Sequence, residues 1–183
     1  MIAAIDVDYD KQRYNAVAAL FTSWTTAHPT KGIWSLQSKG VYEYQAGAFY
    51  LRELVPILSL LDEMSNLPKT IVIDAYCQLS EAGDPGLGLH LYQALDEKIP
   101  IIGVAKTRYK ATTHAIEIFR GKSKRPLFVT AVGCEIAQAA KNIISMHGTN
   151  RIPTIIKLVD TMSKRWEAES GALRTVTALV SGA

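Results

Sequence analysis

The sequence lacks the features that mark several special classes of protein. It has no apolar run near the roughly 20 residues that a membrane-spanning helix requires. Asp6, Asp8 and Asp10 interrupt the first residues, where a secretion signal would be apolar. Its two cysteines exclude a disulfide scaffold, and neither has the spacing of a zinc site. We therefore expect a soluble, cytoplasmic protein.

Neither sign of charge dominates the chain. The formal net charge is +3 and the isoelectric point is about 8.8. Such a small excess is a weak argument for a polyanionic partner, because ordinary solubility charge explains it better. Internal repeats, low-complexity segments and linkers are also absent, and 183 residues suffice for one domain with its own core. We expect a single domain over 1–183, with residues 171–183 as a weakly patterned C-terminal tail.

Hydrophobic periodicity predicts a mixed α/β sheet. Three early strands joined by short turns indicate an antiparallel meander, and helices then alternate with short buried strands, which favours parallel pairing and helices on both faces. The predicted strands are Met1–Val7, Arg13–Phe21, Ile33–Tyr42, Thr70–Ile73, Pro100–Ala105, Ala115–Phe119 and Leu127–Val132. The predicted helices run from about Phe49 to Asn66, from Gly83–Gly88 to Leu95, and over Glu135–Met146 and Thr154–Glu169.

The buried strand over residues 70–73 runs directly into a lone carboxylate, Asp74. A carboxylate there is costly to bury unless it is paired or bound to a cation, and ligands collect at the carboxyl ends of such strands. Asp6 in the first strand, Glu53 early in the first helix and Lys106 after a later strand are candidates to converge on it. Converging carboxylates would repel one another unless a hard cation such as Mg²⁺ joined them, and a lysine would stabilise charge on a phosphate.

Each of these residues also has a simpler interpretation. Asp6 could close a turn, and Asp74 could cap the element that follows it. Glu53 is favourable in the first turns of a helix because of the helix dipole alone. Lys106 could be an ordinary solvated lysine. Their order along the chain, however, is that of a known pattern.

From Ala4 to about Lys164 the chain resembles the endonuclease V family, which has an RNase H-like fold. Short motifs in the right order carry the resemblance, and each of them is weak when taken alone. They are Asp6-Val7-Asp8-Tyr9, the segment from Tyr44 through Gly47 to Arg52-Glu53, the strand ending at Asp74, Ile102-Gly103-Val104-Ala105-Lys106, and Arg151-Ile152-Pro153.

The resemblance implies an endonuclease that cleaves DNA or RNA near a deaminated adenine, with Mg²⁺ as the cofactor and Mn²⁺ as a possible substitute. It implies that Asp6 and Asp74 hold the metal, with Glu53 directly or through water, and that Lys106 lies at the scissile phosphate. Tyr44 would belong to the wedge that replaces a flipped base, and Gly47 would allow the backbone to approach that base. Arg108, Lys110, Lys122, Lys124 and Arg125 are candidates to contact the nucleic-acid backbone, or are ordinary surface charges.

The chain departs from the family pattern where the family reads the base. The stretch Ala75–Ala82 replaces a glycine-rich turn, and Ser80 stands where the family has a histidine. Asp160 replaces a histidine on the last helix, where it is a candidate metal ligand or a solvated residue. We therefore expect a metal-dependent endonuclease with an altered base-reading loop. The alternatives are a catalytically impaired nucleic-acid-binding protein of the same fold, and a structural or regulatory protein.

Overall fold

The computed structural model describes residues 1–11, 13–39, 50–109, 113–166 and 174–175. Its first three strands are β1 (Ile2–Asp10), β2 (Arg13–Phe21) and β3 (Ile33–Lys39). Each pairs antiparallel with the next, so the predicted meander is confirmed. Alternation along β1 places Ile2 and Ala4 in one core and Ala3 and Ile5 in the other, as expected for a strand that is covered on both faces.

Most of the remaining strands extend the sheet on the other side of β1. Strands β4 (Thr70–Ile73) and β5 (Ile101–Ala105) run parallel to β1, while β7 (Leu127–Val132) and β6 (Ile116–Ile118) form an antiparallel hairpin beyond β5. Strand β8 (Arg174–Thr175) pairs with β3, within a segment for which the sequence predicts no element. The order across the sheet is β6-β7-β5-β4-β1-β2-β3-β8. This is the predicted RNase H-like mixed sheet.

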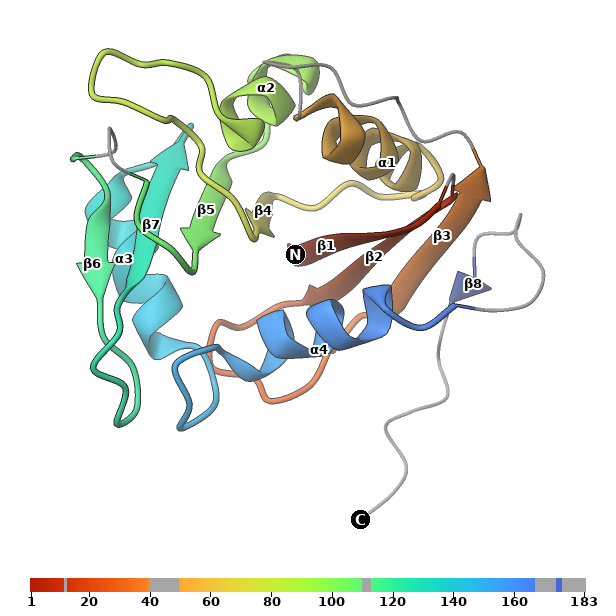
Figure 1. The fold of residues 1–183 in the computed structure, drawn as a ribbon. Coiled ribbons are helices and arrows are strands. Elements are labelled where there is room, and N and C mark those ends of the chain that lie inside the picture. The colour runs from red at the N-terminus through yellow and green to blue at the C-terminus, as the bar shows by residue number, and fades with distance from the viewer. Residues whose placement is uncertain (12, 40–49, 110–112, 167–173, 176–183) are drawn as a thin grey trace.

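Helices cover both faces of the sheet (Figure 1). On one face, α1 (Leu51–Asp62) and α2 (Leu87–Ala94) pack on a core that includes Leu61 and Leu91. On the other, α3 (Ile136–Ser145) and α4 (Thr154–Ser163) pack on a core that includes Ile143 and Ile155. Within the described ranges, none of the helices is long and apolar enough to cross a membrane.

The helices are shorter than their hydrophobic patterns predict. Helix α4 ends at Ser163 and not at Glu169. The cause lies on β2, where the buried Asn15 side-chain amide donates hydrogen bonds to the carbonyl groups of Met162, Ser163 and Arg165. These carbonyls mark the end of the helix, and binding them from the sheet fixes where the helix stops. Asn15 therefore determines how the last turn of α4 lies against the sheet.

Candidate active site

The register of the parallel strands brings the first two acidic side chains together. Ile5 of β1 is paired with Ile73 of β4, so Asp6 and Asp74, one residue further along each strand, are neighbours. Side chains alternate between faces, and Ala4 and Val72 lie in the core under α3 and α4. Asp6 and Asp74 therefore share that face, as the metal hypothesis requires.

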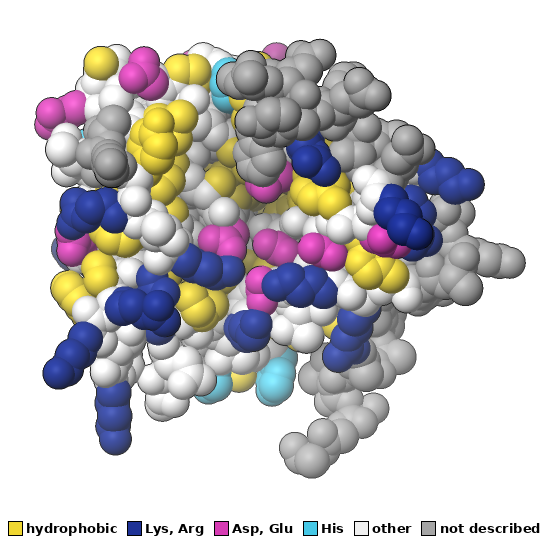
Figure 2. Space-filling view, viewed as in Figure 1, with side chains coloured by type: hydrophobic (Ala, Val, Ile, Leu, Met, Phe, Trp, Pro, Cys, Tyr) yellow, Lys and Arg dark blue, Asp and Glu magenta, His cyan; other side chains and the backbone are white. Residues whose placement is uncertain are grey.

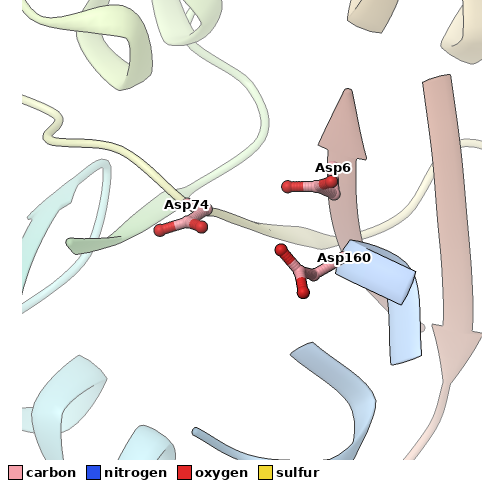
Figure 3. A group of neighbouring side chains, drawn as sticks. All are labelled: Asp6, Asp74 and Asp160. Carbon is pink, nitrogen blue, oxygen red and sulfur yellow. The ribbon is translucent and has the colours of Figure 1, made fainter. Parts of the chain in front are cut away.

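Helix α4 supplies a third carboxylate from above the same face. Carboxylate oxygens of Asp6, Asp74 and Asp160 all lie within 4.8 Å of one another. Figure 3 shows the three side chains beside one another, coming from β1, from the end of β4 and from α4. One turn along α4, the Ser163 hydroxyl donates a hydrogen bond to Asp6 and ties the helix to the strand. The expected convergence of Asp6 and Asp74 is thus confirmed, and these three residues could hold a metal ion.

The electrostatics of Asp6 reflect this crowding. Burial raises the pKa of its carboxyl, and the negative charges of Asp74 and Asp160 raise it further. The hydrogen bond from Ser163 and the charge of Lys106 oppose these effects without cancelling them, so the pKa stays above its ordinary value. A carboxylate under such repulsion gains from a bound cation.

Lysine side chains surround Asp160. The ammonium nitrogens of Lys157 and Lys164 lie 2.6 Å and 2.8 Å from its two carboxylate oxygens, and that of Lys106 lies 3.6 Å away. Burial would raise the pKa of Asp160, but these ammonium groups hold it well below its ordinary value. Figure 2 shows acidic side chains in the middle of this face with lysine and arginine side chains around them. Asp160 is therefore ionised and already compensated by positive charge.

Lys106 follows β5 and forms an ion pair with Asp74. Burial would lower the pKa of its ammonium group, but the hydrogen bond and charge of Asp74 outweigh burial and raise it. Its backbone is fixed as well, because the Arg151 guanidinium donates hydrogen bonds to the carbonyl oxygens of Lys106 and Pro126. Arg151 opens the last of the sequence motifs, and the structure shows that it braces the end of β5.

Glu53 approaches the carboxylates from α1. Pro56 has no N–H to bond the carbonyl of Arg52 one turn earlier. The Tyr9 hydroxyl donates to that carbonyl instead, and the Arg52 guanidinium lies over the Tyr9 ring, with its Cζ 4.8 Å from the ring centroid. This contact joins the first two sequence motifs. Burial and the negative charges of Asp6 and Asp74 together raise the pKa of Glu53 to about 7, against the opposing charge of Arg52.

A cavity of about 230 Å³ lies between these groups. The carboxylates of Asp6, Glu53, Asp74 and Asp160 line it, and Lys164 lies at its edge. The structure therefore brings together every residue that the sequence predicts as a metal ligand. It also brings Lys106 to them through the ion pair with Asp74.

Of the predicted substrate-binding residues, the structure describes Ser80. Tyr44 and Gly47 lie outside the described residues. Ser80 donates a hydrogen bond to Asp84 across the loop that follows β4, over 2.7 Å. The second cavity, about 1000 Å³ in volume, adjoins the carboxylates through Glu53 and Asp74, and Ser80 is not among the described residues that line it.

Sequence reasoning missed several residues of the site. Ser163 lies three positions after Asp160, so helical spacing would have found it once Asp160 was placed in the site. Lys157 and Lys164 follow from the same spacing. Tyr50 and His90, whose rings stack with centroids 3.6 Å apart, both line the second cavity. They had no signal in the sequence, because Tyr50 immediately precedes α1 and His90 lies in α2.

Comparison with known proteins adds independent information. The family model for endonuclease V matches residues 1–146. The chain is similar to endonuclease V of Streptomyces avermitilis (20% identity, TM-score 0.67), covering 88% of this chain and 78% of that one. It is similar to the enzyme of Bacillus subtilis (15%, TM-score 0.70), with coverage of 88% and 78%. Endonuclease V of Ciona intestinalis, in complex with DNA containing an inosine followed by a ribo-adenosine, is also similar (20%, TM-score 0.70), with coverage of 88% and 83%.

These structural similarities, at such low identity, show the fold. No curated protein matches the chain in sequence.

Proposed function

Because this chain belongs to the endonuclease V family, we propose that it is a Mg²⁺-dependent endonuclease acting on nucleic acid. The bond cleaved is a phosphodiester near a deaminated, inosine-type or distorted site, and the cut leaves a 3′-hydroxyl and a 5′-phosphate. The observation that carries the proposal is the meeting of Asp6, Asp74 and Asp160 within 4.8 Å, beside Lys106. A related protein from Ciona intestinalis is in complex with inosine-containing DNA, which supports this substrate class.

The donor set fits a hard divalent cation. It consists of carboxylate oxygens alone, the ligand type that Mg²⁺ prefers, and Mn²⁺ accepts the same ligands. Asp6, Asp74 and Asp160 would hold the ion, with Glu53 contributing directly or through water. A bound Mg²⁺ would supply a Lewis acid that polarises a phosphate and lowers the pKa of water.

The chain's own residues act on the phosphate and on protons. Lys106 keeps its proton, because Asp74 raises the pKa of its ammonium group, so it can neutralise charge that develops on a phosphate at the carboxylates. Without a bound cation, burial and the charges of Asp6 and Asp74 raise the pKa of the Glu53 carboxyl to about 7, so a cation held here would favour its ionised form. Tyr9 and Ser163 hold Glu53 and Asp6 in place through their hydrogen bonds to Arg52 and Asp6.

Positive side chains extend from this site toward the hairpin of β6 and β7. Lys122, Lys124 and Arg125 are exposed in the turn between these strands, and Arg108 pairs with Glu117. We infer that the exposed residues contact phosphates of the nucleic acid, which makes binding weaken as salt rises. Lys110 lies outside the described residues.

Nicking of end-labelled DNA and RNA tests the proposal. Strands with one inosine or none are incubated with Mg²⁺, with Mn²⁺ or with EDTA, and with wild type, Asp74→Asn or Asp62→Asn. Asp62 is an exposed aspartate at the end of α1, so its variant controls for loss of one charge. Metal-dependent nicking by wild type and Asp62→Asn, lost in Asp74→Asn, is the expected result. Binding without nicking in either metal would support the alternative of a nucleic-acid-binding protein without catalysis.

A further inference from the structure

Three lysine side chains meet at the Asp160 carboxylate, which is more than one negative charge requires. The ammonium nitrogen of Lys157 lies 2.6 Å from Oδ2 of Asp160. Those of Lys164 and Lys106 lie 2.8 Å and 3.6 Å from the other oxygen, Oδ1. Two ammonium groups therefore share one carboxylate oxygen, one from the end of α4 and one from the residue that follows β5.

The charges of the site balance without a cation and become positive with one. Asp6, Asp74 and Asp160 carry three negative charges, and the three lysines around them carry three positive ones. A divalent cation held by the aspartates would add two positive charges, of which an ionised Glu53 in the same cavity would offset one. At least one positive charge then has no partner in the site. A phosphate group of nucleic acid is an anion that can supply one.

Lys164 is the lysine that lies in the carboxylate cavity. It lines the cavity of about 230 Å³ together with the acidic side chains, whereas Lys106 lines the larger cavity. Lys106 is also held by its ion pair with Asp74. A phosphate that enters the smaller cavity would therefore meet the ammonium group of Lys164.

The backbone of Lys164 is fixed, while its side chain can change partner. The carbonyl groups of Ser163 and Arg165, on either side of it, accept hydrogen bonds from the buried Asn15 amide over 2.6 Å and 3.1 Å. The Ser163 hydroxyl in turn binds Asp6. The Lys164 side chain, by contrast, is 56% exposed, and exposed ion pairs contribute little to stability. Exchanging its present partner for another anion therefore costs little.

A simpler interpretation assigns Lys164 to the stability of the helix. A lysine four residues after an aspartate, at the end of a helix, is favoured by the ion pair and by the helix dipole. Lys157 provides the comparison, because it pairs with the other oxygen of the same aspartate and lines neither of the two cavities. The two lysines thus carry the same charge on the same aspartate and differ in their access to the carboxylate cavity.

We propose that Lys164 is a phosphate-binding residue, which exchanges the Asp160 carboxylate for a phosphate oxygen of the nucleic acid in the metal-loaded site. The proposal rests on the proposed function, because it requires both a cation and a phosphate at the aspartates. In the metal-loaded site, Lys164 joins Lys106 at the phosphate. In the metal-free site, Lys164 stays paired with Asp160, as in the structure, and neutralises no phosphate.

The salt dependence of binding tests this exchange, because it counts the phosphates that the protein neutralises. Binding of a single strand with one inosine is measured by fluorescence anisotropy across a series of KCl concentrations, in saturating Ca²⁺ in place of Mg²⁺ or in EDTA. Each contact to a phosphate of a single strand contributes about 0.7 to the slope of log K against log salt. We expect Lys164→Met to lower that slope by about 0.7 in Ca²⁺ and by less than about 0.2 in EDTA.

Two further variants serve as comparisons for the slopes. Lys157→Met removes the same charge from the same aspartate and should keep the wild-type slope in both solutions. Lys164→Arg keeps a positive charge at the same place and should also keep the slope, which separates a lost phosphate contact from a folding defect. The proposal is overturned by an unchanged slope in Lys164→Met with Ca²⁺, by an equal decrease in Ca²⁺ and EDTA, or by the same decrease in Lys157→Met.

A neutral phosphate analogue locates the contact. Strands that carry one methylphosphonate, which lacks the negative charge of the phosphate, are compared in Ca²⁺ with the analogue at successive positions around the inosine. Wild type should lose the most affinity at one position, and the loss there should be about threefold smaller in Lys164→Met, because the contact is already missing. A loss that is the same in both proteins at every position would contradict a contact between Lys164 and a phosphate.

The two proposals fail in different ways. Absence of metal-dependent nicking on every strand refutes the endonuclease, and the salt slopes still decide whether Lys164 binds a phosphate. Intact nicking, with equal salt slopes and equal methylphosphonate losses in wild type and Lys164→Met, refutes the role of Lys164 and leaves the endonuclease in place.

Discussion

Replacing Glu53 with glutamine should stabilise the protein, and by an amount that depends on pH. Burial and the charges of Asp6 and Asp74 raise the pKa of Glu53 from 4.5 to about 7. The folded protein therefore holds the proton more tightly than the unfolded chain does. Glutamine keeps the shape of the neutral acid and cannot ionise, so it removes the cost of a negative charge at this place.

The size and sign follow from linkage. Below pH 4.5 Glu53 is protonated in both states, and wild type and Glu53→Gln should have nearly equal free energies of unfolding. Between pH 4.5 and 7 the unfolded chain ionises first, so wild type loses stability as pH rises. Above pH 7 the full cost applies, and the variant should be more stable by up to about 3 kcal/mol, at 1.36 kcal/mol for each pKa unit.

Urea unfolding followed by tryptophan fluorescence measures this difference at pH 4, 6 and 8 in EDTA. Glu63→Gln, at an exposed glutamate just after α1, is the control and should show a small, pH-independent effect. Added Mg²⁺ should reduce the difference in free energy of unfolding between Glu53→Gln and wild type at pH 8, because a cation stabilises ionised Glu53 in wild type. A Glu53→Gln protein that is no more stable than wild type at pH 8 would refute the reasoning.

Three further substitutions test the surroundings of the carboxylates. Lys164→Met removes an ammonium group 2.8 Å from Asp160 and should tighten Mn²⁺ binding about tenfold in isothermal titration. The control Lys141→Met, at an exposed position of α3, should leave Mn²⁺ affinity unchanged. Unchanged Mn²⁺ affinity in Lys164→Met would show that this lysine does not compete with the metal. Gly103→Ala would place a Cβ against the carbonyl oxygen of Ala75, in the loop after β4, and 2.7 Å from the Thr130 hydroxyl on β7. It should lower the free energy of unfolding in urea by about 1–3 kcal/mol, and unchanged stability would mean that the loop after β4 moves aside freely. Asn15→Ala leaves buried carbonyl groups at the end of α4 without their donor, so it should lower the free energy of unfolding by about 1–3 kcal/mol and weaken Mn²⁺ binding. A variant that loses stability but binds Mn²⁺ as tightly as wild type would contradict the role of Asn15 in placing Asp160.

The acidic residues were predictable from sequence for a physical reason. A carboxylate at the end of a buried strand, as at Asp74, is costly unless something compensates it, so its presence is informative. Strand alternation and the order of the motifs strengthened the prediction that Asp6 belongs to the site. For Asp160 the sequence left two interpretations open, because one exposed helix position resembles another. The packing of α4 on the sheet places the Asp160 carboxylate beside those of Asp6 and Asp74, where the three could hold a metal ion. Asn15, on β2, donates hydrogen bonds to carbonyl groups at the end of that helix.

The aromatic lining of the second cavity was beyond the reach of the sequence. Tyr50, just before α1, stacks on His90 of α2, and the Tyr76 hydroxyl, after β4, accepts a hydrogen bond from the N–H of Tyr109, after β5. No periodicity links such residues. The departure of Ala75–Ala82 from the family pattern predicts where base recognition would differ. Only the structure shows that Ala75, Tyr76 and Leu79 of this stretch line the second cavity.

The sequence by itself determined the local elements, because strand alternation and helical spacing are properties of neighbouring residues, and it determined which acids stand at strand ends. Tertiary structure decided which of those acids meet. The parallel register sets Asp6 beside Asp74, and helix packing adds Asp160 and its lysines. Distances between segments far apart in the chain depend on how whole elements pack. The charge balance of the carboxylates and the cavity beside them are therefore decided by the tertiary structure.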